Sequence, residues 1–169
     1  MSVSTAVSYT DEASSNVDIK EQYLESLTLI ERLHRQLLDV IKDELDRTGQ
    51  GDVNSVQALL LFNIGDSELT AGELRTRGHY LGSNVSYNLK KLVESGYIHH
   101  ERSELDRRSV RVRLTEKGRQ VWKLVAALYE RHISAITEIG VLADDDLGAI
   151  NKVLQQIERF WADQIRYRL

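Results

Sequence analysis

The sequence contains no cysteine and no proline among its 169 residues. The absence of cysteine excludes disulfides, thiolate metal sites and cysteine redox switches, and it fits a protein of the reducing cytoplasm. The absence of proline leaves nothing that forces a kink or a break inside a helix. No apolar run is long enough to span a membrane, so we expect no membrane association. Residues 1–17 lack the basic start and hydrophobic block of a signal peptide, and we expect a flexible N-terminal tail there.

Signatures of catalysis are also missing. The sequence has no glycine-rich phosphate loop, no nucleophile elbow and no paired carboxylates in a defined register, so we expect neither an enzyme nor a bound cofactor. His99 and His100 invite a metal interpretation, but adjacent residues of a strand point to opposite faces, and no other Cys or His motif supports the pair. We therefore expect no metal site.

Charge is distributed unevenly along the chain. The net charge is -4, yet between Thr70 and Arg119 there are eleven Lys/Arg against six Asp/Glu, a balance of +5. A polyanion responds to the field of the face that it meets rather than to the charge of the whole protein. The basic middle of the chain is therefore the candidate surface for nucleic acid.

Two helices are expected before this basic middle. Apolar residues recur at steps of three and four over residues 18–48, which predicts one long amphipathic helix that the next glycines end. Asn54 and Gln57 have the spacing of a capping box. They precede a run that is apolar on nearly every side, which predicts a buried helix closed by Gly65.

A helix-turn-helix is predicted next. Thr70 and Glu73 form a second capping box that opens a short helix, and another helix follows over about residues 82–95. The outward residues of this second helix are hydrogen-bonding and cationic side chains of the kind that contact bases and phosphates: Ser83, Asn84, Ser86, Tyr87, Lys90 and Lys91. The alternatives are that the lysines only increase solubility and that Tyr87 packs on the core. Its position two residues after Val85 favours exposure.

From Val110 onward, apolar residues recur at every second position instead of every third or fourth. The alternating residues are apolar Val110, Val112 and Leu114 and basic Arg111 and Arg113. This pattern predicts a strand with one apolar and one basic face, paired with residues 97–102. The short connection places Arg107 and Arg108 at the tip of a β-ribbon, which would form a wing beside the helix-turn-helix. An isolated basic strand would more often be an ordinary solvated face, and the context favours DNA.

Two more helices are expected at the C-terminal end. One begins at Thr115, and the other follows the acidic residues 144–146, which suit a helix N-terminus. The apolar residues of the last helix have heptad spacing: Leu147, Ile150, Leu154, Ile157 and Trp161. Together with the first helix, these helices carry more apolar surface than the core can cover, and a second copy of the chain is the simplest recipient. Aromatic residues such as Trp122 are more often packing residues than part of a cofactor site.

The order of elements and one motif resemble the MarR family of winged helix-turn-helix regulators. In that family the wing carries Asp-x-Arg and then Leu-Thr-x-x-Gly, and the residues in this register are Asp106, Arg108, Leu114, Thr115 and Gly118. The resemblance covers roughly residues 19–169 and looks closest to the LdtR-like alphaproteobacterial branch. It implies a cytoplasmic homodimer formed by the terminal helices. It also implies that Arg108 reaches the minor groove or its phosphates while Asp106 holds the Arg108 guanidinium.

The predicted fold is therefore mainly α with a small β-wing, a MarR-like winged helix-turn-helix with long N- and C-terminal dimerisation helices. Its expected parts are the tail (1–17), the N-terminal dimerisation helix (18–50), the DNA-binding domain (51–115) and the C-terminal dimerisation helices (116–169). One departure is Tyr87, which stands where many family members have an arginine that contacts guanine, so the resemblance does not give the operator sequence.

The predicted function is sequence-specific regulation of transcription. The homodimer would bind a pseudo-palindromic operator in double-stranded DNA, and the resemblance implies modulation by a small-molecule ligand. Two alternatives remain at this point: a ligand-independent or architectural DNA binder, and a winged-helix module that binds other proteins.

Overall fold

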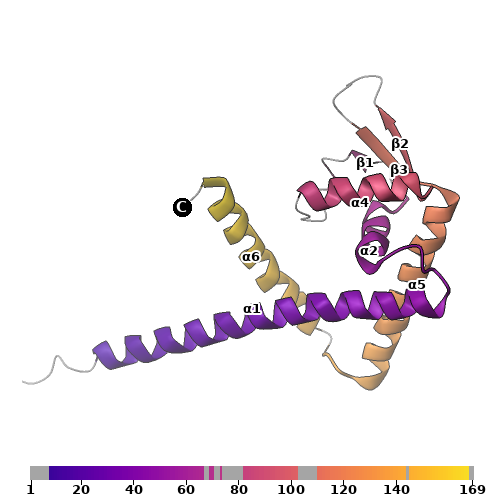
Figure 1. Cartoon of the computed structure of the whole chain (residues 1–169). Coiled ribbons are helices and arrows are strands. Elements are labelled where there is room, and N and C mark those ends of the chain that lie inside the picture. Colours follow the sequence, from indigo (N-terminus) through magenta and orange to yellow (C-terminus); the bar gives the residue numbers. More distant parts are fainter. Residues whose placement is uncertain are drawn as a thin grey trace, which may run out of the picture. The chain divides into compact units, whose positions relative to one another are not determined.

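The computed structural model describes residues 8–66, 69–70, 73, 82–102, 110–143 and 145–167, with side chains omitted at residues 8–17, 70, 82–85, 102 and 110. These residues form mainly helices and one small sheet (Figure 1). The chain divides into two compact units, Met1–Val125 and Ala126–Leu169. Helix α5 runs through the boundary between them.

Helix α1 (Ser8–Arg47) is longer than the sequence pattern predicts. The prediction of a start at Asp18, after a tail over residues 1–17, is wrong for residues 8–17, which are helical; residues 1–7 lie outside the described part. No glycine or proline occurs between Ser8 and Arg47, so nothing in that stretch interrupts the helical hydrogen bonds.

Near the C-terminal end of α1, Arg47 donates from Nε and Nη2 to the carboxylate of buried Glu44, at 3.1 and 2.7 Å. These bonds raise the pKa of Arg47 above its usual value.

Helix α2 (Ser55–Ile64) confirms the predicted capping box. The backbone amide of Gln57 donates to Asn54 Oδ1 at 2.9 Å, and the backbone amide of Asn54 donates to Gln57 Oε1 at 3.1 Å. Gly65 ends the helix with a φ of +60°, a conformation that favours glycine. The ring of Phe62 stacks on Trp122 with 6.4 Å between the centroids, so Trp122 is a packing residue.

The middle of the chain forms a helix and a three-stranded antiparallel sheet. Its elements are β1 (Leu69–Thr70), α4 (Gly82–Glu94), β2 (Ile98–Arg102) and β3 (Val110–Leu114). The strand order is β1-β3-β2, so the predicted pairing of the two wing strands is confirmed. The sequence pattern does not predict β1, because a strand of two residues has no periodicity and forms only by pairing with β3. The sequence predicts a short helix that begins after Thr70. Of the residues in that predicted helix, Glu73 is helical and the rest lie outside the described residues.

The Leu-Thr-x-x-Gly motif joins the sheet to helix α5 (Glu116–Ile139). Leu114 is buried. The Thr115 hydroxyl accepts a hydrogen bond from the Gly118 amide at 3.1 Å, which caps the helix, and donates to the Gly96 carbonyl at 2.7 Å. A Cβ on Gly118 would overlap the carbonyl oxygen of Tyr97. The motif therefore has a structural role at this junction.

The core of the first unit is built from helices and strands that are distant in sequence. Helix α2 contacts α1 and β3, and α4 contacts β2. The largest fully buried aliphatic side chains among the described residues are Ile41 and Leu45 of α1, Leu60, Leu61 and Ile64 of α2, Leu92 of α4, Val112 of β3, and Val121 and Val125 of α5. This packing holds α4 and the sheet together as one domain.

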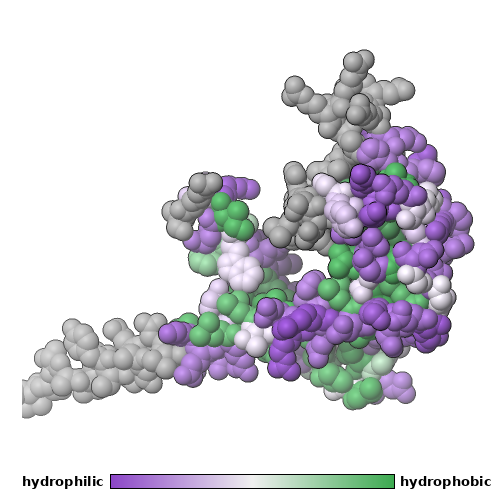
Figure 2. Space-filling view, viewed as in Figure 1, coloured by the Kyte–Doolittle hydropathy of each residue, from purple (hydrophilic) through white to green (hydrophobic). Residues whose placement is uncertain are grey.

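Helix α6 (Asp146–Tyr167) has no buried residue. It begins as predicted with an acidic residue, Asp146, in its first turn. The Asp146 carboxylate accepts from the backbone amide of Ala143, before the helix, at 2.7 Å. Its exposed large apolar side chains are Leu147, Ile150, Val153, Leu154, Phe160, Trp161, Ile165 and Tyr167. Figure 2 shows hydrophobic residues on the visible surface of this helix. Asp144, which was expected at its N-terminal end, lies outside the described residues.

Candidate nucleic-acid interface

Helix α4 has one buried and one exposed side, as its sequence predicts. Leu89 and Leu92 are buried, whereas Ser86, Tyr87, Lys90 and Lys91 are exposed. Tyr87 has 62% of its surface exposed, so the predicted outward orientation is confirmed and the alternative of core packing is wrong. Ser83 and Asn84 belong to the helix, but their side chains lie outside the described ones. The exposed side presents hydroxyl, phenol and ammonium groups.

The sheet carries the second part of the candidate surface. On β3, Val112 and Leu114 are buried and Arg111 and Arg113 are exposed, which confirms the predicted alternation. Arg113 Nη2 donates to Glu101 Oε1 on β2 at 3.1 Å. The predicted tip residues Asp106, Arg107 and Arg108 lie outside the described residues, so the pairing of Asp106 with Arg108 stays a prediction.

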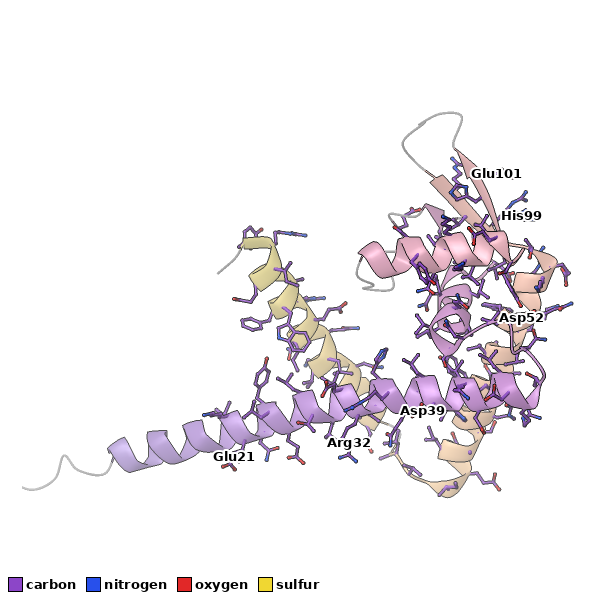
Figure 3. All side chains as sticks on the ribbon, in the orientation of Figure 1. Glu21, Arg32, Asp39, Asp52, His99 and Glu101 are labelled. Carbon is purple, nitrogen blue, oxygen red and sulfur yellow. The ribbon has the colours of Figure 1, made fainter. Side chains whose placement is uncertain are left out.

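The two histidines of β2 point to opposite sides of the sheet. His99 lies opposite Arg113 and His100 opposite buried Val112, so the pair cannot chelate one ion together. Figure 3 labels His99 and Glu101, which share the outer face of β2. Among the residues that the structure describes, no three His, Cys, Asp or Glu side chains lie close enough to hold a metal ion.

Glu94 and Glu101 are acidic members of this surface that the sequence analysis did not single out. Glu94 lies 3.9 Å from Lys90 Nζ and 3.5 Å from Lys91 Nζ. The spacing of Glu94 three and four residues after the lysines is a readable signal of these pairs. The pairing of Glu101 with Arg113 depends on strand register and could not be read from local spacing.

Lys117 is a further residue that local patterns did not identify. Its Nζ lies 4.1 Å from the centroid of the Tyr97 ring and donates to the Ser95 carbonyl at 3.2 Å. It also lies 4.0 Å from the Asp52 carboxylate. Lys117 thus ties the C-terminal end of α4 to the start of α5, because the last carbonyls of a helix attract a cation.

These features define a class of protein. A helix with an exposed polar side, followed by an antiparallel ribbon with a basic face, is the arrangement of a winged helix-turn-helix domain. A family model described as a winged helix DNA-binding domain matches residues 53–118. This range contains α4 and all three strands.

The wider comparisons give the family. The chain is 38% identical over 148 residues to the exopolysaccharide II synthesis transcriptional activator ExpG of Rhizobium meliloti strain 1021, covering 86% of this chain and 74% of that protein. The chain belongs to the MarR family of winged helix-turn-helix transcriptional regulators. The family is one of regulators, not of enzymes. Assignment to the LdtR-like branch stays a prediction.

Solved structures share the fold at lower sequence identity. FabT of Streptococcus pneumoniae, determined in complex with DNA, superposes with a TM-score of 0.65 at 22% identity over 83% of this chain and 98% of FabT. AbsC of Streptomyces coelicolor, a MarR family transcriptional regulator, gives a TM-score of 0.62 at 20% identity over 95% of this chain and 100% of AbsC. No helix in the described part of the chain has the length and apolar character to cross a bilayer.

Proposed function

We propose that the protein binds a pseudo-palindromic operator in double-stranded DNA as a homodimer and thereby regulates transcription. The observation that carries this proposal is the exposed side of α4, where Ser86, Tyr87, Lys90 and Lys91 face solvent while the opposite side is buried. A helix with this distribution can enter the major groove, where hydroxyl groups contact base edges and lysines contact phosphates. Ser83 and Asn84 extend the same recognition helix toward its N-terminus.

The wing supplies the second contact. Arg111 and Arg113 on the outer face of β3 would contact the DNA backbone, and Arg107 and Arg108 at the ribbon tip would reach the minor groove or its phosphates. Asp106 would hold the Arg108 guanidinium by a charge-assisted hydrogen bond. These contacts would fix the position of α4 on the duplex without reading sequence themselves.

The exposed apolar side chains of α1 and α6 support the homodimer. On α1, Ile19 is 66% exposed and Leu33 is 61% exposed; on α6, Leu147 is 53% exposed. Exposed apolar surface of this extent is typical of an interface. We assign residues 18–50 and 116–169 to dimerisation and residues 51–115 to DNA binding. Two-fold symmetry would then place two recognition helices about 34 Å apart, one helical repeat of the duplex.

Modulation by a small-molecule ligand is part of the proposal as a family expectation. A ligand that binds one dimer conformation better than another would change operator affinity by shifting the population between them. This expectation adds no residue to the proposed DNA surface.

Selection of preferred sequences from random DNA tests the function. We expect the wild-type protein to enrich a pseudo-palindromic motif, and Tyr87→Ala and Ser86→Ala to change the preferred bases, because a lost base contact costs about 1–3 kcal/mol of discrimination. Lys90→Ala is the matched control on the same helix. It should lower affinity for all sequences and leave the motif unchanged, because a phosphate contact carries no sequence information.

Two outcomes of the selection would contradict the proposal. An unchanged motif for both Tyr87→Ala and Ser86→Ala would refute base reading by α4. The absence of any enriched motif for the wild-type protein, with only weak binding to every sequence, would favour an architectural or protein-binding module instead.

A further inference from the structure

Three cations of the proposed DNA surface already have carboxylate partners within the protein. Lys90 and Lys91 both lie within 4.0 Å of Glu94, and Arg113 donates to Glu101. The two acids come from different elements, α4 and β2, so the pattern occurs on both parts of the surface.

Glu101 is a neighbour of both arginines of β3. It is directly opposite Arg111 in the strand register, and its carboxylate bonds to Arg113 two residues further along. All three side chains are on the outer face of the sheet and are exposed. A phosphate that approached Arg113 would therefore meet the carboxylate of Glu101 at the same place.

The strength of these pairs decides what they can do. The side chains of Lys90, Lys91, Glu94, Glu101 and Arg113 are 49–76% exposed. An exposed pair of this kind changes an equilibrium constant by about two- to fivefold. The pairs are thus weak enough for a phosphate to replace the carboxylate, yet each one competes with that phosphate.

We propose that Glu94 and Glu101 act as built-in counter-ions that weaken the binding of DNA phosphates to Lys90, Lys91 and Arg113. This inference rests on the proposed DNA-binding function. Binding to a random sequence depends almost entirely on phosphate contacts, so the two carboxylates keep that binding weak. A regulator needs weak random binding because non-specific sites in a genome greatly outnumber its operators.

The test uses a fluorescent duplex of random sequence, with anisotropy titrations over a series of salt concentrations. Glu101→Gln removes the charge while keeping the shape of the side chain, and Glu94→Gln does the same on α4. We expect each variant to bind the random duplex about two- to fivefold more tightly per subunit. We also expect a steeper dependence on salt, because more phosphates are then neutralised.

Glu116→Gln is the matched control. Glu116 is an exposed glutamate that pairs with Arg119 at 3.3 Å, outside the proposed surface. The Glu116→Gln substitution changes the net charge of the protein by the same amount as the other two substitutions. If their effect is local, we expect Glu116→Gln to bind the random duplex as the wild-type protein does. Thermal melting by circular dichroism checks that all three variants fold.

The inference is overturned if folded Glu101→Gln and Glu94→Gln bind the random duplex no more tightly than the wild-type protein. It is also overturned if Glu101→Gln binds more weakly, because the carboxylate would then be orienting Arg113 toward the phosphate. An equal gain in Glu116→Gln would indicate an effect of net charge and would likewise overturn it. Enrichment of an operator by the wild-type protein in the selection experiment separates these results from a failure of the proposed function itself.

Discussion

At the scale of single residues, Gly118 shows how a family motif can combine two roles. Its amide donates to the Thr115 hydroxyl, and its missing side chain leaves room for the Tyr97 carbonyl. Thr115 in turn bonds to Gly96 at the end of α4. The Leu-Thr-x-x-Gly part of the motif thus joins the segment between α4 and β2 to the start of α5, whereas the Asp-x-Arg part is proposed to contact DNA.

Replacing Gly118 with alanine should destabilise the protein. The added Cβ would overlap a backbone oxygen, and such overpacking costs about 1–3 kcal/mol. Urea unfolding followed by circular dichroism measures the change. Gly148→Ala is the matched control, because Gly148 is helical with no atom within 4 Å of the added Cβ, so alanine there should stabilise the protein by about 0.5–1 kcal/mol. Equal unfolding midpoints for Gly118→Ala and the wild-type protein would contradict the steric role.

At the scale of elements, α2 depends on its N-terminal cap. It is a helix of ten residues, too short to be stable alone, and it contributes Leu60, Leu61 and Ile64 to the core. The reciprocal hydrogen bonds of Asn54 and Gln57 satisfy backbone amides that would otherwise lack partners. Because α2 contacts both α1 and β3, its stability affects the whole DNA-binding domain.

Substitution of Asn54 by alanine should lower the free energy of unfolding by about 1 kcal/mol, the usual cost of losing a capping side chain. Chemical denaturation measures the change. Asn54→Ser keeps a hydroxyl acceptor at the same position and should retain most of the wild-type stability. If the alanine and serine variants proved equally stable, the cap would not be what stabilises this helix.

At the scale of the whole molecule, the apolar side chains that the described chain leaves exposed require an explanation. Leu154 is 41% exposed and Trp161 is 37% exposed, and both belong to the predicted heptad seam of α6. Residues on such a seam become buried when a second helix packs against it. In the proposed homodimer, DNA binding and dimerisation would be coupled, because the two α4 helices would have to face the same side of the duplex.

Leu154→Asp should convert the proposed dimer to a monomer, because association would bury an unpaired charge. Sedimentation velocity measures the oligomeric state, and the same variant should lose operator binding. Gln156→Asp adds the same charge about 200° around the helix from Leu154 and should remain dimeric. A wild-type protein that sediments as a monomer, or a Leu154→Asp variant that stays dimeric, would contradict the proposed assembly.

Much of the fold could be predicted because local patterns carry it. The alternation of Val112 and Arg113 predicted the faces of β3, and the capping box at Asn54 predicted the start of α2. The exposure of Tyr87 followed from its helical position relative to the buried residues. Each of these features depends on residues within one or two turns of each other, so the periodicity of the sequence is sufficient to specify them.

The remaining features depend on residues brought together by folding. β1 exists only because Leu69 and Thr70 lie beside β3, and Glu101 meets Arg113 only through the register of β2 and β3. Lys117 reaches Ser95 across 22 positions of sequence. The sequence by itself determined α2, α4, α5 and α6, the wing strands and the basic character of the middle of the chain. Tertiary structure alone decided which cations have carboxylate partners and why Gly118 has no room for a side chain, because both depend on distances between segments that no local pattern encodes.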